Sequence, residues 1–377
     1  MFNIQPLNRF AGKAAAIKRP REIACFSYDE NHQLHLDASS LKYYYPPRLP
    51  ADLSAGYENF RNVEAAKPPD EHLIALLATI KNLEEKEGKK LEVDIVTWRG
   101  MMTKIMTAPF DRFNSCEMNA TLYDGTIFIE EDRQTRVENE ESQKRNLRHG
   151  VQPASFEMMS YWGYKFETLC VIPDTWDNVS REQIENRPNE QVSNYAQYCS
   201  VVRTGMGGTS LILGGEVDAI WDQKPDDPDA PINWVELKTN EEPYDQRSLE
   251  KFHRKLLKHW AQSFLLGVPK IIVGFRRRNI LQHLEEIDVM SMPGKSKQFS
   301  QPGEWDGNTC INFAAAFLEF LKKTITSEGT WRISRKERDG TITVYKTSDK
   351  GHGDILSPEF VAWRQTLHAQ EAAKMLA

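Results

Sequence analysis

Apolar residues recur along the chain at two spacings, one typical of helices and one typical of strands. Apolar positions three and four residues apart predict amphipathic helices, as at Leu73, Leu76, Leu77 and Ile80. The predicted helices cover Asp70–Lys86, a short stretch near Met101–Met106, Glu157–Val171, Gln246–Leu266, Asn308–Thr326 and Glu359–Met375.

Runs rich in β-branched and aromatic residues predict the strands. Two hairpins are expected where Asp-Gly pairs interrupt such runs, because this dipeptide favours tight two-residue turns. The hairpins span Glu117–Glu130 and Trp331–Tyr345, and other strands are predicted at Leu91–Thr97, Tyr198–Arg203, Ser210–Trp221, Trp234–Thr239 and Lys270–Arg276. Hairpins with interleaved helices predict an α+β fold, with one domain over residues 1–377 built on a mixed, largely antiparallel sheet flanked by helices.

Three segments lack either pattern. Residues 1–21 are basic, and we expect a solvated arm there; the alternative for Lys18–Arg21 is a nuclear address. Asp132–Gly150 carries many charges and few apolar residues, which predicts a mobile surface loop. Asp222–Pro231 contains three prolines, which forbid regular structure.

Composition narrows the class of protein. The chain has 377 residues with 48 Lys and Arg against 54 Asp and Glu, a net charge of −6. This argues against a protein that simply coats nucleic acid, although a local basic groove is still compatible with it. No apolar run approaches the ~18–20 residues of a membrane span, and the N-terminus lacks the apolar run of a signal peptide. We therefore expect no membrane partner and no secretion.

The cysteines predict a reducing compartment. There are five of them, an odd number, at wide spacings and without a C-x-x-C pair. A disulfide framework or a structural zinc site is therefore not expected.

The strongest chemical signal is a pair of acidic motifs inside apolar runs. Glu216 and Asp218 are two residues apart, and Glu236 and Lys238 repeat this spacing on the next predicted strand. Side chains alternate along a strand, so each pair faces one side. If the two strands pair, three carboxylates and an ammonium group converge.

Three neighbouring carboxylates repel one another unless a cation lies between them. An all-oxygen donor set suits Mg²⁺ or Mn²⁺, and two such ions would stabilise both oxygens of a phosphoryl displacement. The alternative is a pair of solvated edge strands with ordinary ion pairs. The repeat of the spacing inside two apolar runs favours the metal site.

Three neighbouring features extend this candidate site. Glu167 begins a helix rich in apolar residues and would add a fourth carboxylate, although it would also suit a helix surface. On the predicted helix Gln246–Leu266, a polar stripe of Lys255, Lys258 or His259, and Gln262 is placed to meet phosphates or to be simply solvated. Arg99 directly follows a strand, where a guanidinium group is suited to grip phosphate.

Taken together, these segments resemble the DXO/Rai family of RNA 5′-end decapping nucleases. The resemblance runs from about Arg21 to about Lys322 and includes six separated blocks in the family's order. They are Thr97–Gly100, Gly163–Glu167, Gly215–Asp218, Val235–Thr239, Lys255–Leu265 and Gly274–Arg276. The resemblance implies a sheet core related to PD-(D/E)xK-type nucleases.

The same resemblance implies roles for individual residues. The expected ligands of one or two Mg²⁺ or Mn²⁺ ions are Glu167, Glu216, Asp218, Glu236 and the backbone carbonyl of Leu237. The expected RNA contacts are Trp98, Arg99, Gly100, Cys199, Glu216, Lys238 and Gln262. The expected catalytic residues are Glu216, Asp218, Glu236, Lys238 and Gln262.

The implied reactions are removal of incomplete or unmethylated guanosine caps, of NAD caps, and of pyrophosphate from 5′-triphosphate RNA. Three segments have sequences similar to those of fungal nuclear members of the family, which stabilise a 5′–3′ exoribonuclease: Ile23–Ser27, Thr103–Met106 and Tyr161–Gly163. A nuclear location and that partner are therefore expected. Three alternatives are a mainly non-catalytic exonuclease cofactor, a decapping enzyme with its own 5′–3′ exonuclease activity, and a DNA endonuclease of the restriction type.

Overall fold

Two β-sheets form the centre of the computed structural model, which describes residues 1–66, 72–113, 115–138, 155–297 and 305–376. Among these residues the larger sheet has ten strands. In spatial order they are β1 (Phe2–Asn3), β17 (Thr341–Ser348), β16 (Thr330–Arg335), β7 (Cys116–Tyr123), β8 (Thr126–Glu131), β6 (Ile95–Trp98), β11 (Thr209–Glu216), β10 (Gln197–Met206), β2 (Ile17–Tyr28) and β3 (Leu34–His35).

The smaller sheet has seven strands within the same described ranges. Their order is β5 (Ala51–Asp52), β15 (Ile280–Asp288), β14 (Lys270–Arg277), β13 (Trp234–Glu241), β12 (Ala219–Ile220), β4 (Tyr43–Tyr44) and β9 (Val171–Ile172). Both sheets are mixed: β6 runs parallel to β8 and β11, and β13 runs parallel to β14, while most other pairs are antiparallel. The predicted α+β class with a mixed sheet is confirmed, although two sheets replace the single one expected.

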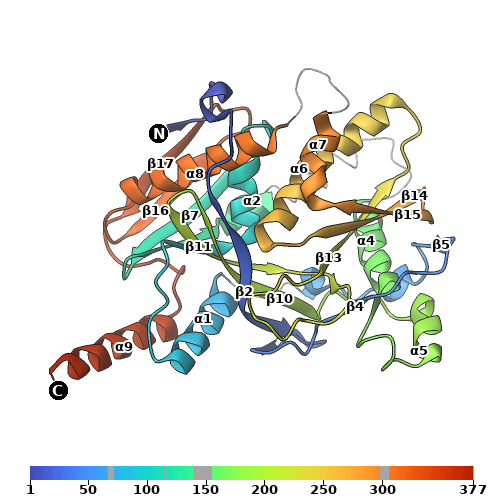
Figure 1. Ribbon diagram of the computed structural model, residues 1–377, viewed down its shortest axis with the longest axis horizontal. Helices are drawn as coiled ribbons and strands as arrows, with labels where there is room; N and C mark the ends of the chain where they lie inside the picture. The colour runs from blue at the N-terminus through green and yellow to red at the C-terminus, as the bar shows by residue number, and fades with distance from the viewer. Residues whose placement is uncertain (67–71, 114, 139–154, 298–304, 377) are drawn as a thin grey trace.

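Helices cover both sheets and fill the space between them (Figure 1). Their bounds are α1 (Ile74–Glu87), α2 (Arg99–Thr107), α4 (Phe156–Cys170), α5 (Arg181–Asn186), α6 (Gln246–Leu266), α7 (Met292–Lys297), α8 (Gly307–Thr324) and α9 (Pro358–Leu376). In the described part of the chain, none of these helices combines the length and apolar character needed to cross a membrane.

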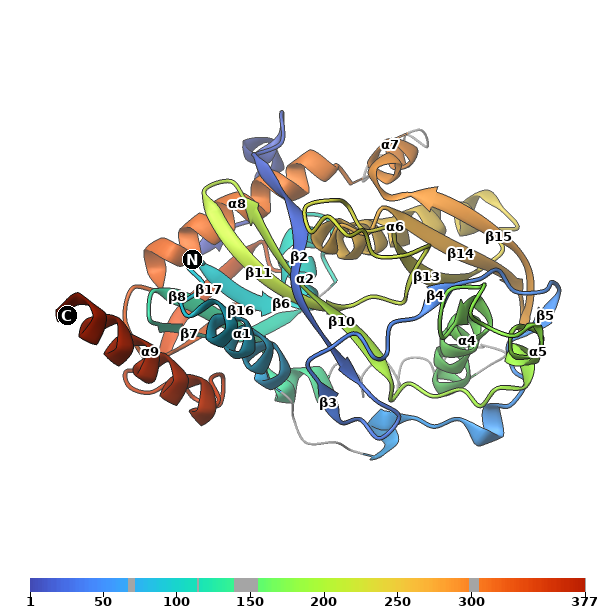
Figure 2. The same ribbon diagram turned by 60° about the horizontal axis from the view of Figure 1, so that its bottom comes forward.

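The largest hydrophobic core lies where α2, α6 and α8 pack together. Met102, Trp260 and Phe313 are all buried there, each on a different one of these helices. A second core joins α1 and α9 to the ten-stranded sheet, and a third joins α4 to the seven-stranded sheet. Figures 1 and 2 show α9 at one end of the molecule and α4 with α5 at the other.

The predicted helices and the first hairpin turn agree with the structure, but the second tight turn is wrong: residues 336–340 join β16 and β17, and Arg338, with φ 62°, is left-handed there. Helix α6 has the predicted bounds because its amphipathic run is capped at both ends: the Asp245 carboxylate accepts from the backbone N–H of Ser248, and Gly267 adopts φ 74°. Strands β7 and β8 are joined by Asp124 and Gly125, with φ of 51° and 78°. Both residues are left-handed, as a tight hairpin turn requires.

The prediction of a solvated arm at residues 1–21 is wrong. Phe2 pairs with Ile342 across β1 and β17, and Ile4 and Phe10 are buried. Strand β2 begins at Ile17 and runs through the basic stretch. The apolar side chains are spaced too irregularly to show a period, yet together they cover the face of α8 through ring contacts such as Phe10 with Phe313.

The other two irregular segments differ in outcome. Asp222–Pro231 has no helix or strand, as predicted. Of the expected loop Asp132–Gly150, residues 133–138 are helical, which corrects that part of the prediction, and residues 139–150 lie outside the described residues.

The predicted continuous strand Ser210–Trp221 is divided between the two sheets. Strand β11 ends at Glu216 in the ten-stranded sheet, and β12 begins at Ala219 in the seven-stranded sheet. Val217 and Asp218 form the crossing, where the Val217 N–H donates to the Tyr198 carbonyl at 3.1 Å. The acidic motif therefore lies at the junction between the sheets.

Candidate active site

The two acidic motifs meet at this junction of the sheets. Strand β12 pairs antiparallel with β13, with Ala219 opposite Val235, so the next pair outward is Asp218 and Glu236. The backbone N–H of Leu237 donates to Asp218 Oδ2 at 2.6 Å, which fixes the carboxylate against β13. Glu216 lies two residues before Asp218, at the end of β11. The structure thus brings together the three carboxylates that the sequence analysis placed near one another.

Two cations hold Glu236, the most deeply buried carboxylate of the cluster. Its Oε1 lies 2.7 Å from Lys238 Nζ, and its Oε2 lies 3.5 Å from Arg99 Nη1. Lys238 Nζ is also 3.7 Å from Asp218 Oδ2. Glu236 Oε2 and Arg99 Nη1 are both buried without a hydrogen bond, although they form this ion pair. One face of Glu236 is therefore left for a further electrophilic partner.

Glu167 approaches the same cluster from helix α4. The helix packs closely on the seven-stranded sheet because Gly274 on β14 has no side chain: a Cβ there would lie 2.6 Å from the ring of Phe166. Burial raises the pKa of Glu167 well above its usual value, and the nearby carboxylate of Asp218 raises it further. The close packing at Gly274 therefore places a fourth acidic group beside the first three.

The electrostatics divide the carboxylates into two kinds. Burial would raise the pKa of Glu236, but Lys238 and Arg99 outweigh burial and lower it to about 2. Burial raises the pKa of Glu216 to about 7, with a further contribution from Asp218. Burial likewise raises the pKa of Asp218 to about 6, although Lys238 opposes the shift. Many protein atoms surround the Glu216 carboxylate, which explains the raised pKa. The residue is nevertheless accessible to water at the surface.

Lys238 remains positively charged within this buried cluster. Burial would lower its pKa, but the ion pairs with Glu236 and Asp218 raise it above the usual lysine value. Two positive charges, Lys238 and Arg99, therefore face a cluster of four carboxylates, those of Glu167, Glu216, Asp218 and Glu236. This excess of acidic groups is the signature of a site that gains stability from a cation.

The donor set fits a divalent metal ion in its chemistry. Carboxylate oxygens are the ligands that Mg²⁺ and Mn²⁺ prefer. One oxygen of Glu236 accepts no hydrogen bond, and the raised pKa values of Glu216 and Asp218 show that their negative charges are not fully compensated by the protein. No three Asp, Glu, His or Cys side chains in the described ranges are already arranged to hold an ion. The ligand roles of Glu167, Glu216, Asp218, Glu236 and the Leu237 carbonyl stay predictions.

The predicted RNA-contact residues surround the cluster. Trp98 ends β6, is half-buried, and its Nε1 donates to the His72 carbonyl at 2.9 Å. Gly214 allows this indole to lie against β11, since a Cβ there would be 2.7 Å from the ring. Arg99 and Gly100 form the first turn of α2, which starts directly after Trp98.

Cys199 and Gln262 approach from the other side. Cys199 on β10 is the register partner of Glu216 on β11, so the two residues are direct neighbours across the strands. Gln262 lies on α6, one turn after His259, whose pKa is lowered to about 3 by burial and by Lys238. His259 therefore lies near Lys238, and Gln262 is one helical turn further along the same face of α6.

The sequence analysis missed Tyr164 as a member of the site. Burial raises the pKa of Tyr164 to about 12, Asn194 bonds to its hydroxyl, and the carboxylates of Glu167 and Glu216 raise the pKa further. Tyr164 precedes Glu167 by three residues, so it lies one helical turn away on the same face. That spacing was the available signal.

Fold and site define a class: a nuclease-type α+β domain with an acidic, lysine-containing site suited to a divalent cation. A family model described as RAI1-like PD-(D/E)XK nuclease matches residues 18–361. The chain belongs to this nuclease family.

The relatives and solved structures agree with the assignment. A curated Emericella nidulans protein named decapping nuclease RAI1 is 56% identical over 97% of this chain and 98% of its own length. A Candida albicans Rai1 structure in complex with pU5 and Mn²⁺ is similar with a TM-score of 0.88 and 32% identity, covering 97% of this chain and 100% of that chain. A Scheffersomyces stipitis Rai1 structure in complex with 3′-NADP⁺ and a calcium ion has a TM-score of 0.85 and 29% identity, covering 94% and 98%.

Proposed function

We propose that this chain is a metal-dependent RNA decapping nuclease that hydrolyses a phosphate linkage at the 5′ end of RNA. The observation that carries the proposal is the junction of the sheets, where Asp218 is bonded to the backbone of β13 opposite Glu236 and Lys238. The names of the relatives support the reaction class, and the pU5 and Mn²⁺ bound to the Candida protein support RNA and a divalent ion.

The chain's own residues supply positioning and charge. A divalent cation, when bound, would stabilise the negative charge that develops on a phosphate in the reaction. Glu167, Glu216, Asp218, Glu236 and the Leu237 carbonyl would hold one or two such ions, Mg²⁺ or Mn²⁺.

Lys238 has a fixed position because Glu236 lies 2.7 Å from its ammonium group. Its charge would neutralise an approaching phosphate oxygen or orient the attacking water. Arg99 adds a second fixed positive charge beside it.

The substrate would be RNA with an unfinished or unusual 5′ end. We include unmethylated guanosine caps, NAD caps and 5′-triphosphates, with release of pyrophosphate from the last. Support for the NAD cap comes from the 3′-NADP⁺ bound to the Scheffersomyces relative. A 5′–3′ exonuclease step following removal of the cap is the second candidate activity, and it rests on the pU5 ligand of the Candida relative.

One incubation tests the proposal. The purified protein is mixed with Mn²⁺ and with RNAs that carry a triphosphate, a guanosine cap, NAD or a monophosphate, and the released species are identified by mass. We expect release from the first three, and we expect the double variant Glu216→Ala/Asp218→Ala to be folded and inactive. Turnover by that variant at the wild-type rate would refute the site, and no turnover of any RNA by the wild type would refute the function.

Two further proposals rest on the resemblance to fungal nuclear members. The chain would reside in the nucleus and bind a 5′–3′ exoribonuclease. Capture of such an exonuclease by the Glu216→Ala/Asp218→Ala variant would show that this role is separable from catalysis. Failure of both the wild type and the variant to capture the exonuclease would refute the partner.

A further inference from the structure

A groove of about 840 Å³ runs along the N-terminal half of α6 and reaches the end of β13. Asn240 lines the groove and follows Lys238 by two residues on β13, so the two side chains share one face of the strand. Lys255 on α6 donates to Asn240 Oδ1 at 2.9 Å, which links the helix to the strand at the point where groove and site meet. The groove therefore reaches the strand that also carries Glu236 and Lys238.

A stripe of cations lines this groove. Arg247, Lys251, Arg254 and Lys258 recur at helical spacing on one face of α6, and the same face continues to Gln262. All four cations are exposed. Because α6 rises about 1.5 Å per residue, the stripe from Arg247 to Gln262 is about 22 Å long.

The first three of these cations have no acidic partner. Within the described ranges of the chain, no carboxylate lies at ion-pair distance from Arg247, Lys251 or Arg254. Lys258 is paired with Asp111 at 2.9 Å. The field of the unpaired charges is felt nearby: burial lowers the pKa of Lys255, and Lys251 lowers it further.

Three of the four acidic residues that line the groove, Asp111, Glu242 and Asp245, already have partners. Asp245 caps α6 through the N–H of Ser248, and Glu242 forms an ion pair with Arg277. Glu241 also lines the groove and partly offsets its charge. The remaining balance along the helix face is positive, although the chain as a whole carries −6.

Two aromatic rings stand exposed at the same groove. Phe113 is 69% exposed and Tyr244 is 81% exposed, and both line it. Large rings so open to water are uncommon and mark contact surfaces when they gather in one place. Rings interleaved with cations are the combination that binds single-stranded nucleic acid, because bases stack on rings and phosphates meet the charges.

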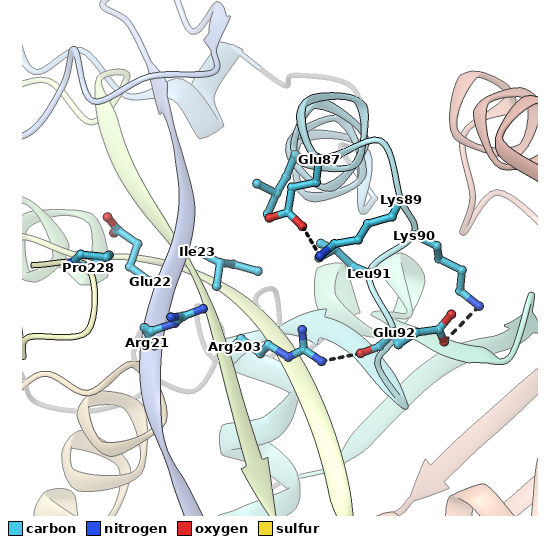
Figure 3. Close-up of a pocket in the computed structure, with 11 residues that line it drawn as sticks. Arg21, Glu22, Ile23, Glu87, Lys89, Lys90, Leu91, Glu92, Arg203 and Pro228 are labelled. Atoms are coloured by element: carbon cyan, nitrogen blue, oxygen red, sulfur yellow. Dashed lines mark hydrogen bonds and ion pairs between the residues drawn. The ribbon is translucent and has the colours of Figure 1, made fainter. Parts of the chain in front are cut away.

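A second hollow shows the contrast. It holds about 600 Å³ between β2, β10 and the turn after α1 (Figure 3). Its cations are used internally: Lys89 pairs with Glu87 at 3.5 Å, and Arg203 donates to the Glu92 carbonyl at 2.6 Å. Cations that are already paired in this way are poorly suited to bind an anionic ligand. Arg247, Lys251 and Arg254 on α6 are unpaired and are available to one.

We propose that the α6 groove binds the single-stranded RNA body downstream of the 5′ end, with phosphates on Arg247, Lys251 and Arg254 and bases on Phe113 and Tyr244. This inference rests on the proposed function and extends it from the 5′ end to the chain that follows. Binding here would be indifferent to base sequence, because stacking and phosphate contacts read no base edges. RNAs long enough to reach the groove would be preferred over very short ones.

The test compares two sets of charge-neutralising substitutions. The groove variant is Arg247→Gln/Lys251→Gln/Arg254→Gln, and the matched control is Lys81→Gln/Lys86→Gln/Lys89→Gln on and after α1, which removes the same charge elsewhere. Binding of a 5′-monophosphate RNA of about 20 nucleotides is measured by fluorescence anisotropy in EDTA, which prevents turnover. Hydrolysis of a triphosphate dinucleotide and of a triphosphate 20-mer is measured separately with Mn²⁺.

For the groove variant we expect affinity for the 20-mer to fall about tenfold or more, and the slope of log K against log salt to decrease by about 2. Its hydrolysis of the dinucleotide should stay within about twofold of wild type. The control variant should change neither quantity. The variant Phe113→Ala/Tyr244→Ala should lose about tenfold in 20-mer affinity with little change in salt slope.

The outcomes separate the two proposals. Equal loss in the groove and control variants, or unchanged 20-mer affinity in the groove variant, would overturn the RNA groove and leave decapping standing. Binding of an acidic peptide that the groove variant loses, while its affinity for the 20-mer is unchanged, would assign the groove to a protein partner and overturn the RNA groove as well. Absence of hydrolysis by the wild type would refute the proposed function, while the binding measurements in EDTA still decide the groove.

Discussion

Divalent metal affinity should depend steeply on pH, because protons compete for the same carboxylates. Burial raises the pKa of Glu216 to about 7 and that of Asp218 to about 6, and neighbouring carboxylates contribute to both shifts. At pH 8 about nine-tenths of the protein has both groups ionised, and at pH 6 about one-twentieth does. Mn²⁺ affinity should therefore fall by at least about 20-fold from pH 8 to pH 6.

The sign follows from the direction of the shifts. Groups whose pKa is raised take up protons as the pH falls through 7 and 6, and each bound proton must leave before the oxygen can bind a cation. Glu167, whose pKa burial also raises well above its usual value, would steepen the dependence if it binds the same ion. Glu236, held at about 2, would contribute nothing in this range.

Calorimetric titration of Mn²⁺ at pH 6, 7 and 8, in two buffers of different ionisation enthalpy, measures both the affinity and the protons released. The control is Glu216→Gln, which removes the group that titrates near 7. That variant should bind Mn²⁺ more weakly at every pH. Its affinity should fall only about twofold between pH 8 and pH 6, against about 20-fold for the wild type. Affinity that is flat within about twofold over this range in the wild type would refute the electrostatic reasoning.

Three further substitutions test other parts of the account. Lys238→Met should lower kcat for 5′-triphosphate RNA by about 100-fold or more in steady-state assays, since it removes a fixed charge from the reacting phosphate, and a loss under threefold would contradict this role. Gly214→Ala places a Cβ 2.7 Å from the Trp98 ring, so urea unfolding should show a loss of about 1–3 kcal/mol together with a raised KM for RNA; unchanged values would show that the ring is free to move. Arg364→Met leaves the fully buried Glu84 carboxylate without its ion pair at 2.6 Å, so scanning calorimetry should show a loss of about 3–5 kcal/mol, or about 4–6 °C in Tm, and a shift below 1 °C would mean the pair is dispensable.

Elements that depend on local sequence could be predicted well. Helix α6 combines an amphipathic run with Asp245 before it and Gly267 after it, so both ends are encoded within a few residues. The turn at Asp124 and Gly125 is similar, because this dipeptide tolerates the left-handed backbone that a tight hairpin needs.

The clustering of Glu216, Asp218, Glu236 and Lys238 could be predicted from the sequence, but the geometry of the cluster only in part. The sequence predicts one continuous strand through the acidic motif, because the residues on both sides of Glu216 and Asp218 are mostly apolar. The chain instead changes sheets after Glu216, and this choice depends on the pairing of β12 with β13 and β4. Such pairings join segments distant in sequence, so no local pattern specifies them.

The N-terminal segment failed for a related reason. Phe2, Ile4 and Phe10 are spread among polar residues, so they show no helix or strand period. Phe2 and Phe10 pack against α8, some 300 residues later, where Phe313 and Phe317 provide the matching surface. Tertiary contacts of this kind override local pattern.

The central claim is that the junction of the two sheets binds a divalent cation through its carboxylates. The most direct measurement is the anomalous difference map of a crystal soaked in Mn²⁺. We predict one or two peaks at that junction, with oxygens of Asp218, Glu236 and Glu216 or Glu167 within about 2.1 Å of a peak. A map with no peak there, or with Mn²⁺ bound only by other residues, would contradict the account.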